Sequence, residues 1–344
     1  MSSRFSLTYQ KHLLEFKKPS GTSRGILTHK KCWILTLKDN VTKLEGTGEC
    51  SIIEGLSPDY DSDEQYESKL EELRLKIGFY LENPKQLNSF PSILMGMEMC
   101  MFDLVNGGKR IYFPSSFTDG NQSIPINGLV WMGDKSFMKE QIETKLEQGY
   151  SCIKMKVGAI DFETELDLLR EIRKSYTKEQ IVLRVDANGS FSPAEALDKL
   201  NALAELDIHS IEQPIEVGQL EEMKHLCRTS PVPVALDEEL IGINETRDRA
   251  ELLDKIKPQF IILKPSLHGG FSGSQEWIKL AKERGIDWWM TSALESNIGL
   301  NAIAQFAGKL NVQQPQGLGT GALFVENFES PLYIEQGRLF YKNT

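Results

Sequence analysis

Five short apolar segments in the second half of the chain each end in an ionisable residue. They are Ile153–Lys156, Val182–Asp186, Ser210–Glu212, Val234–Asp237 and Phe260–Lys264. Their charged ends recur every 25 to 30 positions, which matches about one strand, one helix and two short loops per repeat. This alternation predicts a parallel (β/α) barrel of the TIM type, in which the carboxyl ends of the strands surround one mouth. The pattern therefore predicts two lysines and three carboxylates at that mouth.

The N-terminal part of the chain has a different pattern. Short apolar runs such as Cys32–Leu37 alternate with turn residues, which predicts an antiparallel sheet. Ser62 and Gln65 form a capping box at the start of a first amphipathic helix. A second helix, Ile93–Leu104, is apolar almost all round and is expected to be buried. Strands followed by helices predict an α+β capping domain over residues 1–122.

The rest of the chain divides into a barrel and a tail. Alternating strands and helices assign residues 123–321 to the barrel, and Pro331–Tyr341 predicts a hairpin that turns at Gln336–Gly337. Because no barrel strand then remains unassigned, we expect residues 322–344 to return to the sheet of the capping domain. The predicted fold class is α/β, a modified (β/α) barrel of the TIM type with an α+β capping domain.

Side-chain alternation places the charges inside the barrel. Residues two positions apart on a strand share a face, so Lys154 and Lys156 point inward while Ile153 and Met155 face the helices. This strand alone fits a solvated edge strand equally well. In the other four segments, however, the terminal charge likewise falls on the inward-facing positions of its strand. Buried charges are tolerated when they are paired or bound to a metal. We therefore predict a functional site.

Three carboxylates without a neighbouring His or Cys form an all-oxygen site. Asp186, Glu212 and Asp237 supply ligands that suit a hard cation, so we expect Mg²⁺, with Mn²⁺ as a possible substitute. The alternative is a set of structural ion pairs to neighbouring basic residues such as Lys154 and Arg184. These two interpretations remain open from the residues alone.

The flanking lysines predict proton chemistry. Repulsion among Lys154, Lys156 and the cation is expected to lower the pKa of an amine, which makes a lysine usable as a base near neutral pH. One lysine can then remove a proton from carbon while the cation and Lys264 stabilise the resulting oxyanion. A glycine-rich segment, Gly317–Gly321, could instead cradle a phosphate, but no helix start is evident behind it.

Composition narrows the class of protein. With 344 residues, 26% charged, 40% hydrophobic and a formal net charge of −10, the chain predicts a globular protein without a nucleic-acid partner. The five cysteines are odd in number and scattered, so neither a disulfide frame nor a zinc site is indicated. The N-terminus lacks an apolar signal core and no run of about 18 apolar residues occurs. We expect a cytoplasmic protein without a membrane partner.

Several short motifs resemble the enolase superfamily, in its muconate-lactonizing subgroup, over nearly the whole chain. They are Lys154-Met155-Lys156, Asp186-Ala187-Asn188, Glu212-Gln213-Pro214, Asp237-Glu238 and Lys264-Pro265. A lysine base that works beside magnesium is an established pattern of that superfamily. Within the subgroup, Ile126–Trp131 and Ser292–Ser296 are most similar to the o-succinylbenzoate synthase family.

The resemblance implies a reaction. It is the Mg²⁺-dependent syn-dehydration of 2-succinyl-6-hydroxy-2,4-cyclohexadiene-1-carboxylate to o-succinylbenzoate, a carbon–oxygen lyase step of menaquinone biosynthesis. Lys156 would remove the proton α to the carboxylate and then protonate the departing hydroxide on the same face, while Lys264 would stabilise the enediolate. The metal ligands would be Asp186, Glu212 and Asp237.

The small-molecule carboxylate substrate needs further contacts. The candidate substrate-binding residues are Lys154, Arg184, Ser292, Glu295 and Ser23. The segment Ser20–Gly25 resembles a mobile loop that closes over the site.

Two alternatives remain. An N-acyl or N-succinyl amino-acid racemase, or a related epimerase or cycloisomerase, would use Lys156 and Lys264 as bases on opposite faces of the α-carbon. Dipeptide epimerases carry Asp-x-Asp at the position of Gly317–Gly319. This difference disfavours a dipeptide epimerase but not an N-succinyl amino-acid racemase. A binding protein without activity would not need both lysines. The sequence leaves the acyl-chain preference and the oligomeric state open.

Overall fold

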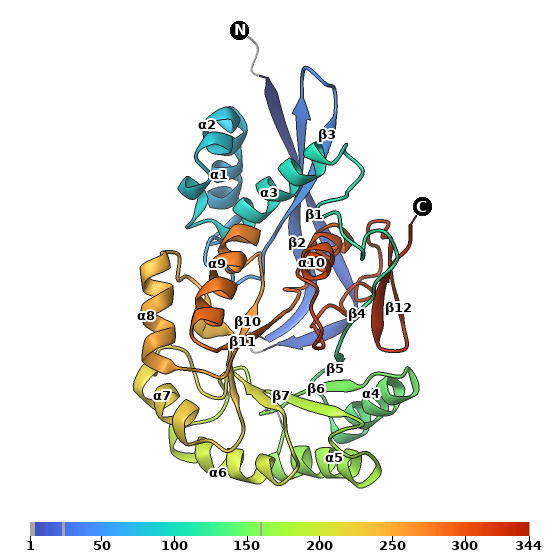
Figure 1. Cartoon of the computed structure of the whole chain (residues 1–344), viewed down its shortest axis with the longest axis vertical. Helices are drawn as coiled ribbons and strands as arrows, with labels where there is room; N and C mark the ends of the chain where they lie inside the picture. Colours follow the sequence, from blue (N-terminus) through green and yellow to red (C-terminus); the bar gives the residue numbers. More distant parts are fainter. Residues whose placement is uncertain (1–3, 23–24, 159, 344) are drawn as a thin grey trace.

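The computed structural model describes residues 4–22, 25–158 and 160–343, and Figure 1 shows a sheet with helices standing above a curved sheet that helices surround. The upper part is the predicted capping domain. Its antiparallel strands, in the order β1-β2-β3, are β1 (Phe5–Thr22), β2 (Gly25–Asp39) and β3 (Glu45–Ser51). Its helices are α1 (Asp63–Leu75), α2 (Ile77–Glu82), the 3₁₀ turn η1 (Pro84–Leu87) and α3 (Pro91–Val105).

The start of α1 is the predicted one. The Ser62 side chain accepts a hydrogen bond from the backbone N–H of Gln65 at 3.2 Å, which satisfies a free donor of the first helical turn. Helix α3 is also as predicted, because most of its side chains are buried between the capping sheet and the barrel. The backbones of β3 and α3 nearly touch, since a Cβ atom added to Gly48 would lie 2.0 Å from the carbonyl oxygen of Gly96.

The lower part is a parallel barrel, as predicted. Its seven hydrogen-bonded strands follow chain order: β5 (Gly128–Val130), β6 (Cys152–Lys156), β7 (Val182–Asp186), β8 (Ser210–Glu212), β9 (Val234–Leu236), β10 (Phe260–Leu263) and β11 (Asp287–Met290). Gln316 forms a single bridge to Ile126, which precedes β5, and Gly317 forms one to Thr291, which follows β11. Gln316 and Gly317 therefore occupy the position of the eighth barrel strand.

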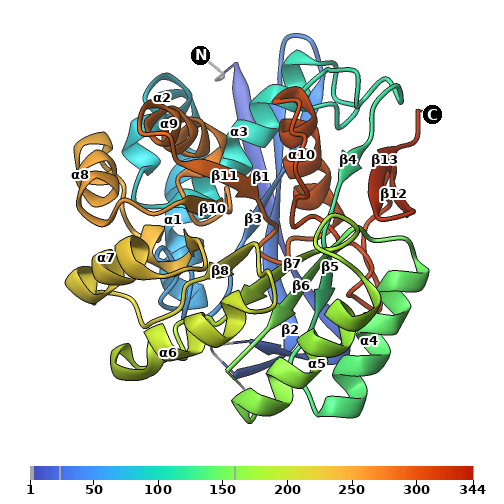
Figure 2. The ribbon, with the colours of Figure 1, turned by 60° about the horizontal axis from the view of Figure 1, so that its bottom comes forward.

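Helices surround the outer face of this barrel (Figure 2). They are α4 (Lys135–Glu147), α5 (Phe162–Ser175), α6 (Pro193–Ala204), α7 (Leu220–Thr229), α8 (Thr246–Ile256), α9 (Gly270–Glu283) and α10 (Asn297–Lys309), with the 3₁₀ turn η2 (Glu238–Leu240). Inward-facing Ala235, Ile262 and Trp289 form a small apolar cluster in the barrel. This cluster lies inside the barrel below the charged strand ends.

The C-terminal hairpin corrects one expectation. Strands β12 (Leu332–Glu335) and β13 (Arg338–Tyr341) pair with β4 (Ile124–Pro125) in a sheet of their own and do not join the sheet of the capping domain. The segment before the hairpin does return to the capping sheet, because Lys17 N–H donates to the Leu323 carbonyl at 2.9 Å and Val325 N–H donates to that of Glu15 at 2.8 Å.

Two acidic side chains fasten the capping domain to the barrel. Glu49 of β3 is completely buried and accepts hydrogen bonds from the backbone N–H groups of Ser296 at 2.9 Å and Gly299 at 2.7 Å, at the start of α10. Glu98 of α3 accepts from the Phe271 N–H at 2.6 Å, at the start of α9. Carboxylates at helix N-termini satisfy free N–H groups and favour the helix dipole. These contacts hold the loops that precede α9 and α10.

All five cysteines, at positions 32, 50, 100, 152 and 227, are buried and free. Within the described part of the chain, no helix is both long enough and apolar enough to cross a membrane.

The contact between β3 and α3 generates a prediction about stability. Gly48→Ala places a methyl group against the backbone of Gly96, which cannot rotate away, so we expect the free energy of unfolding to fall by at least about 2 kcal/mol. A matched control is Gly78→Ala in α2, where an added Cβ meets nothing within 4 Å. The control should be neutral or stabilising by up to about 1 kcal/mol. Urea unfolding of both variants measures the difference, and equal stability would contradict the close packing.

Candidate active site

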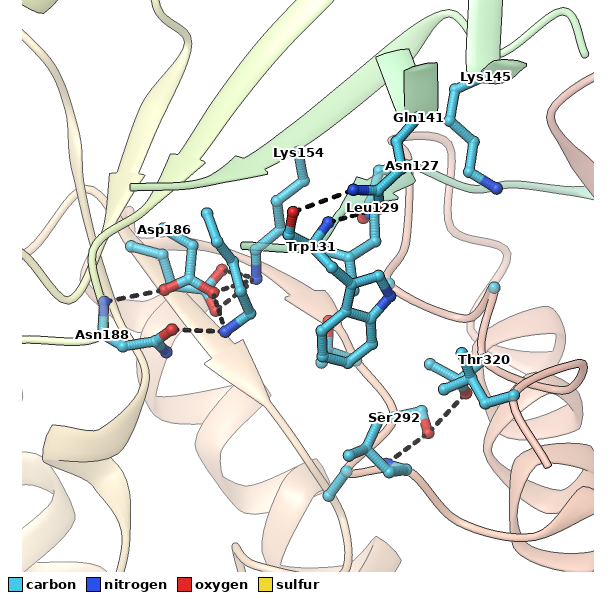
Figure 3. A pocket seen from close by; sticks show the side chains of 18 of the residues that line it. Asn127, Leu129, Trp131, Gln141, Lys145, Lys154, Asp186, Asn188, Ser292 and Thr320 are labelled. Atoms are coloured by element: carbon cyan, nitrogen blue, oxygen red, sulfur yellow. Dashed lines mark hydrogen bonds and ion pairs between the residues drawn. The ribbon is translucent and has the colours of Figure 1, made fainter. Parts of the chain in front are cut away.

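The mouth of the barrel holds a cavity of about 420 Å³. Figure 3 shows Asp186 and Asn188 on one side, Ser292 and Thr320 on another, and Trp131 between them. Its charged lining includes Lys154, Lys156, Asp186, Glu212, Glu238 and Lys264. Parallel pairing explains part of this arrangement, because Lys156 of β6 lies opposite Asp186 of β7, which lies opposite Glu212 of β8. Side chains at paired positions point to the same side of a sheet.

The two lysines of β6 contact different partners. The ammonium group of Lys154 donates to both oxygens of Glu212, at 2.6 and 2.7 Å, and forms an ion pair with Asp186 at 2.9 Å. Lys156 donates to the side-chain oxygen of Asn188 and lies 3.6 Å from the Asp186 carboxylate. The Lys156 ammonium group is thus held beside the cavity with a polar partner.

Lys264 follows β10 and approaches from the other side of the barrel. Its ammonium group is ion-paired with Asp237. Its backbone N–H donates to Nδ1 of the buried His268 at 2.9 Å. The structure thus brings together the lysines and carboxylates that the sequence predicted at the mouth.

The neighbouring carboxylates determine the pKa values of two of these lysines. Burial alone would lower the pKa of Lys154, but attraction by Asp186, Glu212 and Asp237 outweighs it, so the pKa is raised. Lys264 is also buried, and attraction that comes first from Asp237 likewise raises its pKa. Carboxylates surround both amines more closely than other amines do. The lowered amine pKa that we expect from repulsion among Lys154, Lys156 and a bound cation stays a prediction.

The carboxylates repel one another. Burial, followed by repulsion from Asp186, raises the pKa of Glu212 to about 8. Burial also raises the pKa of Asp237, although Lys264 opposes this. For Asp186, burial acts in the same direction, but Lys154 and Lys156 outweigh it and lower the pKa. Three carboxylates buried at neighbouring strand ends therefore need positive charge close by if they are to stay ionised.

The donor set fits a hard divalent cation. As the side chains are placed, no three His, Cys, Asp or Glu residues in the described ranges form a ready metal-binding group, and lysine ammonium groups pair with the carboxylates. However, Asp237 Oδ1 and Glu238 Oε2 are buried, and neither has a hydrogen-bond partner in the part of the chain that the structure describes. Unpartnered buried carboxylate oxygens beside Asp186 and Glu212 offer the hard ligands that Mg²⁺ prefers.

Two candidate substrate-binding residues lie outside the cavity lining. Arg184 shares the inward parity of Asp186 but sits two residues deeper, where it donates to the Pro315 carbonyl at 2.8 Å and lies 3.9 Å from the Trp289 ring centroid. Glu295 is completely buried behind the wall. Ser292 and Lys154 do line the cavity.

One candidate and part of another lie outside the described residues. Ser23 falls in the gap between residues 22 and 25, and so does part of the segment Ser20–Gly25 that was expected to form a mobile loop.

Sequence reasoning missed several residues of the mouth. Asn188 accepts from Lys156 and donates to Glu238 at 3.0 Å, so it links a lysine to the next carboxylate around the barrel. Its backbone has a φ of 44°, a left-handed conformation that Asn tolerates well, and its place two residues after Asp186 was the available signal. Trp131 and Thr320 also line the cavity, and they belong to Ile126–Trp131 and Gly317–Gly321, two segments that the sequence singled out without predicting that they form its wall.

Comparison with known proteins gives consistent relatives. Residues 137–342 match the enolase C-terminal domain-like family. The chain is 44% identical to the o-succinylbenzoate synthase of Desulfotalea psychrophila, over 98% of this chain and 99% of that protein. The crystal structure of MenC from D. psychrophila superimposes with a TM-score of 0.86 and 42% identity, over 98% and 100% of the two chains. The N-succinylamino acid racemase of Thermus thermophilus is 30% identical, over 81% of this chain and 75% of that protein.

The carboxylate cluster generates a prediction about metal binding. Asp186→Asn, Glu212→Gln and Asp237→Asn each remove one anionic ligand, so each should weaken Mg²⁺ binding at least about tenfold in calorimetric titration. Asp59→Asn, which alters a buried carboxylate of the capping domain, is the matched control and should leave the affinity unchanged. Unchanged affinity in all three variants would mean that these carboxylates form structural ion pairs only.

Proposed function

The chain belongs to the enolase superfamily and, within it, to the o-succinylbenzoate synthase family, and on this premise we propose that it dehydrates 2-succinyl-6-hydroxy-2,4-cyclohexadiene-1-carboxylate to o-succinylbenzoate. It is thus a carbon–oxygen lyase of menaquinone biosynthesis. The observation that carries the proposal is the approach of Lys156 and Lys264 to one cavity from different strand ends, with three carboxylates between them.

Asp186, Glu212 and Asp237 would hold the divalent cation, Mg²⁺ with Mn²⁺ as a possible substitute. When bound, the cation supplies positive charge to the substrate carboxylate next to the reacting carbon. The partner is a small dicarboxylate, and the cytoplasm is the proposed compartment.

Lys156 is proposed to act as base and then as acid. As a neutral amine it removes the proton α to the carboxylate, and the electrons of the broken C–H bond move into the carboxylate to give an enediolate. When the C–O bond to the hydroxyl breaks, the Lys156 ammonium group returns the proton to the departing oxygen, and water leaves from the same face. Asn188 and Asp186 orient the ammonium group for both transfers.

Lys264 is proposed to stabilise the enediolate. Its ion pair with Asp237 and the bond from its backbone to His268 hold a positive charge in a fixed place at the cavity. Groups that are already oriented toward developing charge need little rearrangement as that charge appears. A role as a fixed charge suits an elimination on one face of the substrate.

N-succinyl amino-acid racemisation is the second candidate. The similarity to the racemase of T. thermophilus and the two lysines favour it. The higher identity and fuller coverage of the o-succinylbenzoate synthase favour the lyase as the main activity.

The role of Lys156 generates a prediction. Lys156→Ala removes the only group assigned to both proton transfers, so turnover of the cyclohexadiene substrate should fall by about 10² to 10⁴-fold or more. Steady-state kinetics would measure the loss, and thermal unfolding would show that the fold persists. Lys139→Ala, which alters an exposed lysine of α4, is the control. A Lys156→Ala enzyme that kept more than about a tenth of wild-type turnover would contradict the role.

The role of Lys264 separates lyase from racemase. Lys264→Arg keeps a positive charge but no usable base, so dehydration should survive better in Lys264→Arg than in Lys264→Ala. Racemisation of N-succinyl amino acids, if present, should vanish in both. Incubation in D₂O adds a second measurement, because a racemase exchanges the α-hydrogen of both enantiomers and a strict lyase exchanges neither. Equal loss of dehydration in the two variants would argue against an electrostatic role.

A further inference from the structure

One arm of the cavity lies between β5 and α4. Asn127, which precedes β5, and Leu129 of β5 line the cavity, and so does Lys145 of α4. The stem of Lys145 lies against Gly128, because a Cβ atom added to that glycine would meet Cγ and Cδ of the lysine at 3.0 Å. A larger residue at this position would displace the lysine. The glycine thus allows the Lys145 side chain to lie across β5, next to Asn127.

Lys145 has no carboxylate partner among the residues that the structure describes. Its ammonium group lies 3.5 Å from the side-chain oxygen of Gln148 and 5.0 Å from the centroid of the Tyr150 ring. Burial lowers the pKa of Lys145. Lys154 and Lys264, by contrast, are paired with carboxylates. A partly buried ammonium group without a counter-charge gains more from an incoming anion than one that is already paired.

Asn127 is a second unsatisfied group in this arm. It is only 5% exposed, and its buried Oδ1 has no hydrogen-bond partner in the described ranges. Because Oδ1 is enclosed by protein, the Nδ2 donor is the end of the amide that a ligand in the cavity can reach. The neighbouring Gln141 differs, since it exchanges hydrogen bonds with the backbone of Trp131 at 2.9 and 3.1 Å. Asn127 is therefore the amide that remains available to a ligand here.

The walls of the arm are largely apolar. They include Leu129, Trp131, Phe137 and Tyr150. In Figure 3, Asp186 lies at the left and Lys145 at the right, with Asn127 and Leu129 between them. The arm thus leads away from the metal-binding carboxylates toward an amine. Its amide donor, apolar walls and terminal cation suit an acyl chain that ends in a carboxylate.

We propose that this arm binds the acyl chain of the substrate, with Lys145 as the cation that receives its terminal carboxylate and Asn127 as a hydrogen-bond donor to an acyl oxygen. The inference rests on the proposed function, whose substrate carries a succinyl chain. The carboxylate on the ring then stays with the divalent cation, and the carboxylate of the chain has a separate partner. N-succinyl amino acids carry the same chain, so the assignment also covers the second candidate function.

The length of the succinyl chain fits this placement. Leu129 lies beside Lys154 in the pairing of β5 with β6, and Asn127 precedes Leu129 by two residues, about 7 Å along the strand. Four bonds join the ring to the terminal carboxylate, which is about 5 Å when extended, and a hydrogen bond adds about 3 Å. A ring that lies beside Lys154 can therefore extend its chain to this arm, where the flexible Lys145 stem adjusts to the far end.

The first experiment compares two ligands that differ only at the end of the acyl chain. o-Succinylbenzoate ends in a carboxylate, whereas 2-butanoylbenzoate ends in a methyl group. In competitive inhibition with Mg²⁺ present, the wild-type enzyme should bind the first at least about tenfold more tightly. Lys145→Gln should reduce this ratio to less than about threefold without weakening 2-butanoylbenzoate. Lys145→Arg keeps the charge and should retain most of the ratio.

Two further lysine variants complete this experiment. Lys139→Gln removes an exposed amine of the same helix, which pairs with Glu171, and should keep the wild-type ratio. Lys18→Gln alters a capping-domain lysine that also lines the cavity. Loss of the ratio in Lys18→Gln alone would overturn the assignment, and so would an unchanged ratio in Lys145→Gln. Equal weakening of both ligands in Lys145→Gln would mean a structural role only and would also overturn it.

The second experiment tests Asn127. Asn127→Ala should weaken o-succinylbenzoate and 2-butanoylbenzoate by a similar factor of about threefold or more, because both carry the acyl carbonyl group. Benzoate has no acyl chain, so its inhibition constant should stay within about twofold of the wild-type value. Equal weakening of benzoate would overturn the contact, and thermal unfolding would show whether the variant is folded.

Turnover of the cyclohexadiene substrate provides an independent measurement. The contact with Lys145 is made in the ground state and in the transition state alike, so Lys145→Gln should raise KM about tenfold or more and leave kcat nearly unchanged. A fall in kcat with unchanged KM would overturn the binding role. Failure of the proposed function looks different, since wild-type enzyme with Mg²⁺ would then not convert this substrate at all, while the preference for the terminal carboxylate could still be measured.

Discussion

The compensation of buried charge at the ends of neighbouring barrel strands governs the rest of the site. Asp186, Glu212 and Asp237 are almost fully buried, so each needs a cation within reach. Lys154 and Lys264 provide part of that positive charge directly. One oxygen of Asp237 has no hydrogen-bond partner among the described residues, so it is available to a further cation. Metal binding, placement of the lysines and attraction of an anionic substrate thus follow from one electrostatic requirement.

The capping domain contributes to this site through its contacts with the barrel, and its Lys18 also lines the cavity. Glu49 extends from the capping domain to the N-terminus of α10, and Glu98 extends to that of α9. Each accepts hydrogen bonds from backbone N–H groups there. These helices follow the loops that carry Lys264 and Ser292. A carboxylate that satisfies several N–H groups at a helix start resists displacement, since each lost bond would leave a buried donor unpaired. The docking of the two domains therefore helps to fix the geometry of the mouth.

Much of the site could be predicted because strand periodicity carries it. The spacing of the apolar segments gave the barrel, and parity along β6 directed Lys154 and Lys156 inward, where the structure places them. Parity does not give depth along the barrel axis. Arg184 has the parity of a mouth residue, yet it lies one layer lower against Trp289. Periodicity therefore identified the charged set but not which of its members reach the cavity.

The sequence by itself determined the parallel barrel, the α+β cap and the set of charged strand ends, because local periodicity and turn residues encode them. Only the tertiary structure decided how those groups are paired. The pKa of Lys154 is raised because three carboxylates converge on it from separate strands. The C-terminal hairpin pairs with β4, while the segment before it contacts the edge of β1. Glu295 lies behind the wall because serines from two loops meet its oxygens. Each outcome depends on contacts between residues distant in the chain, which no local pattern encodes.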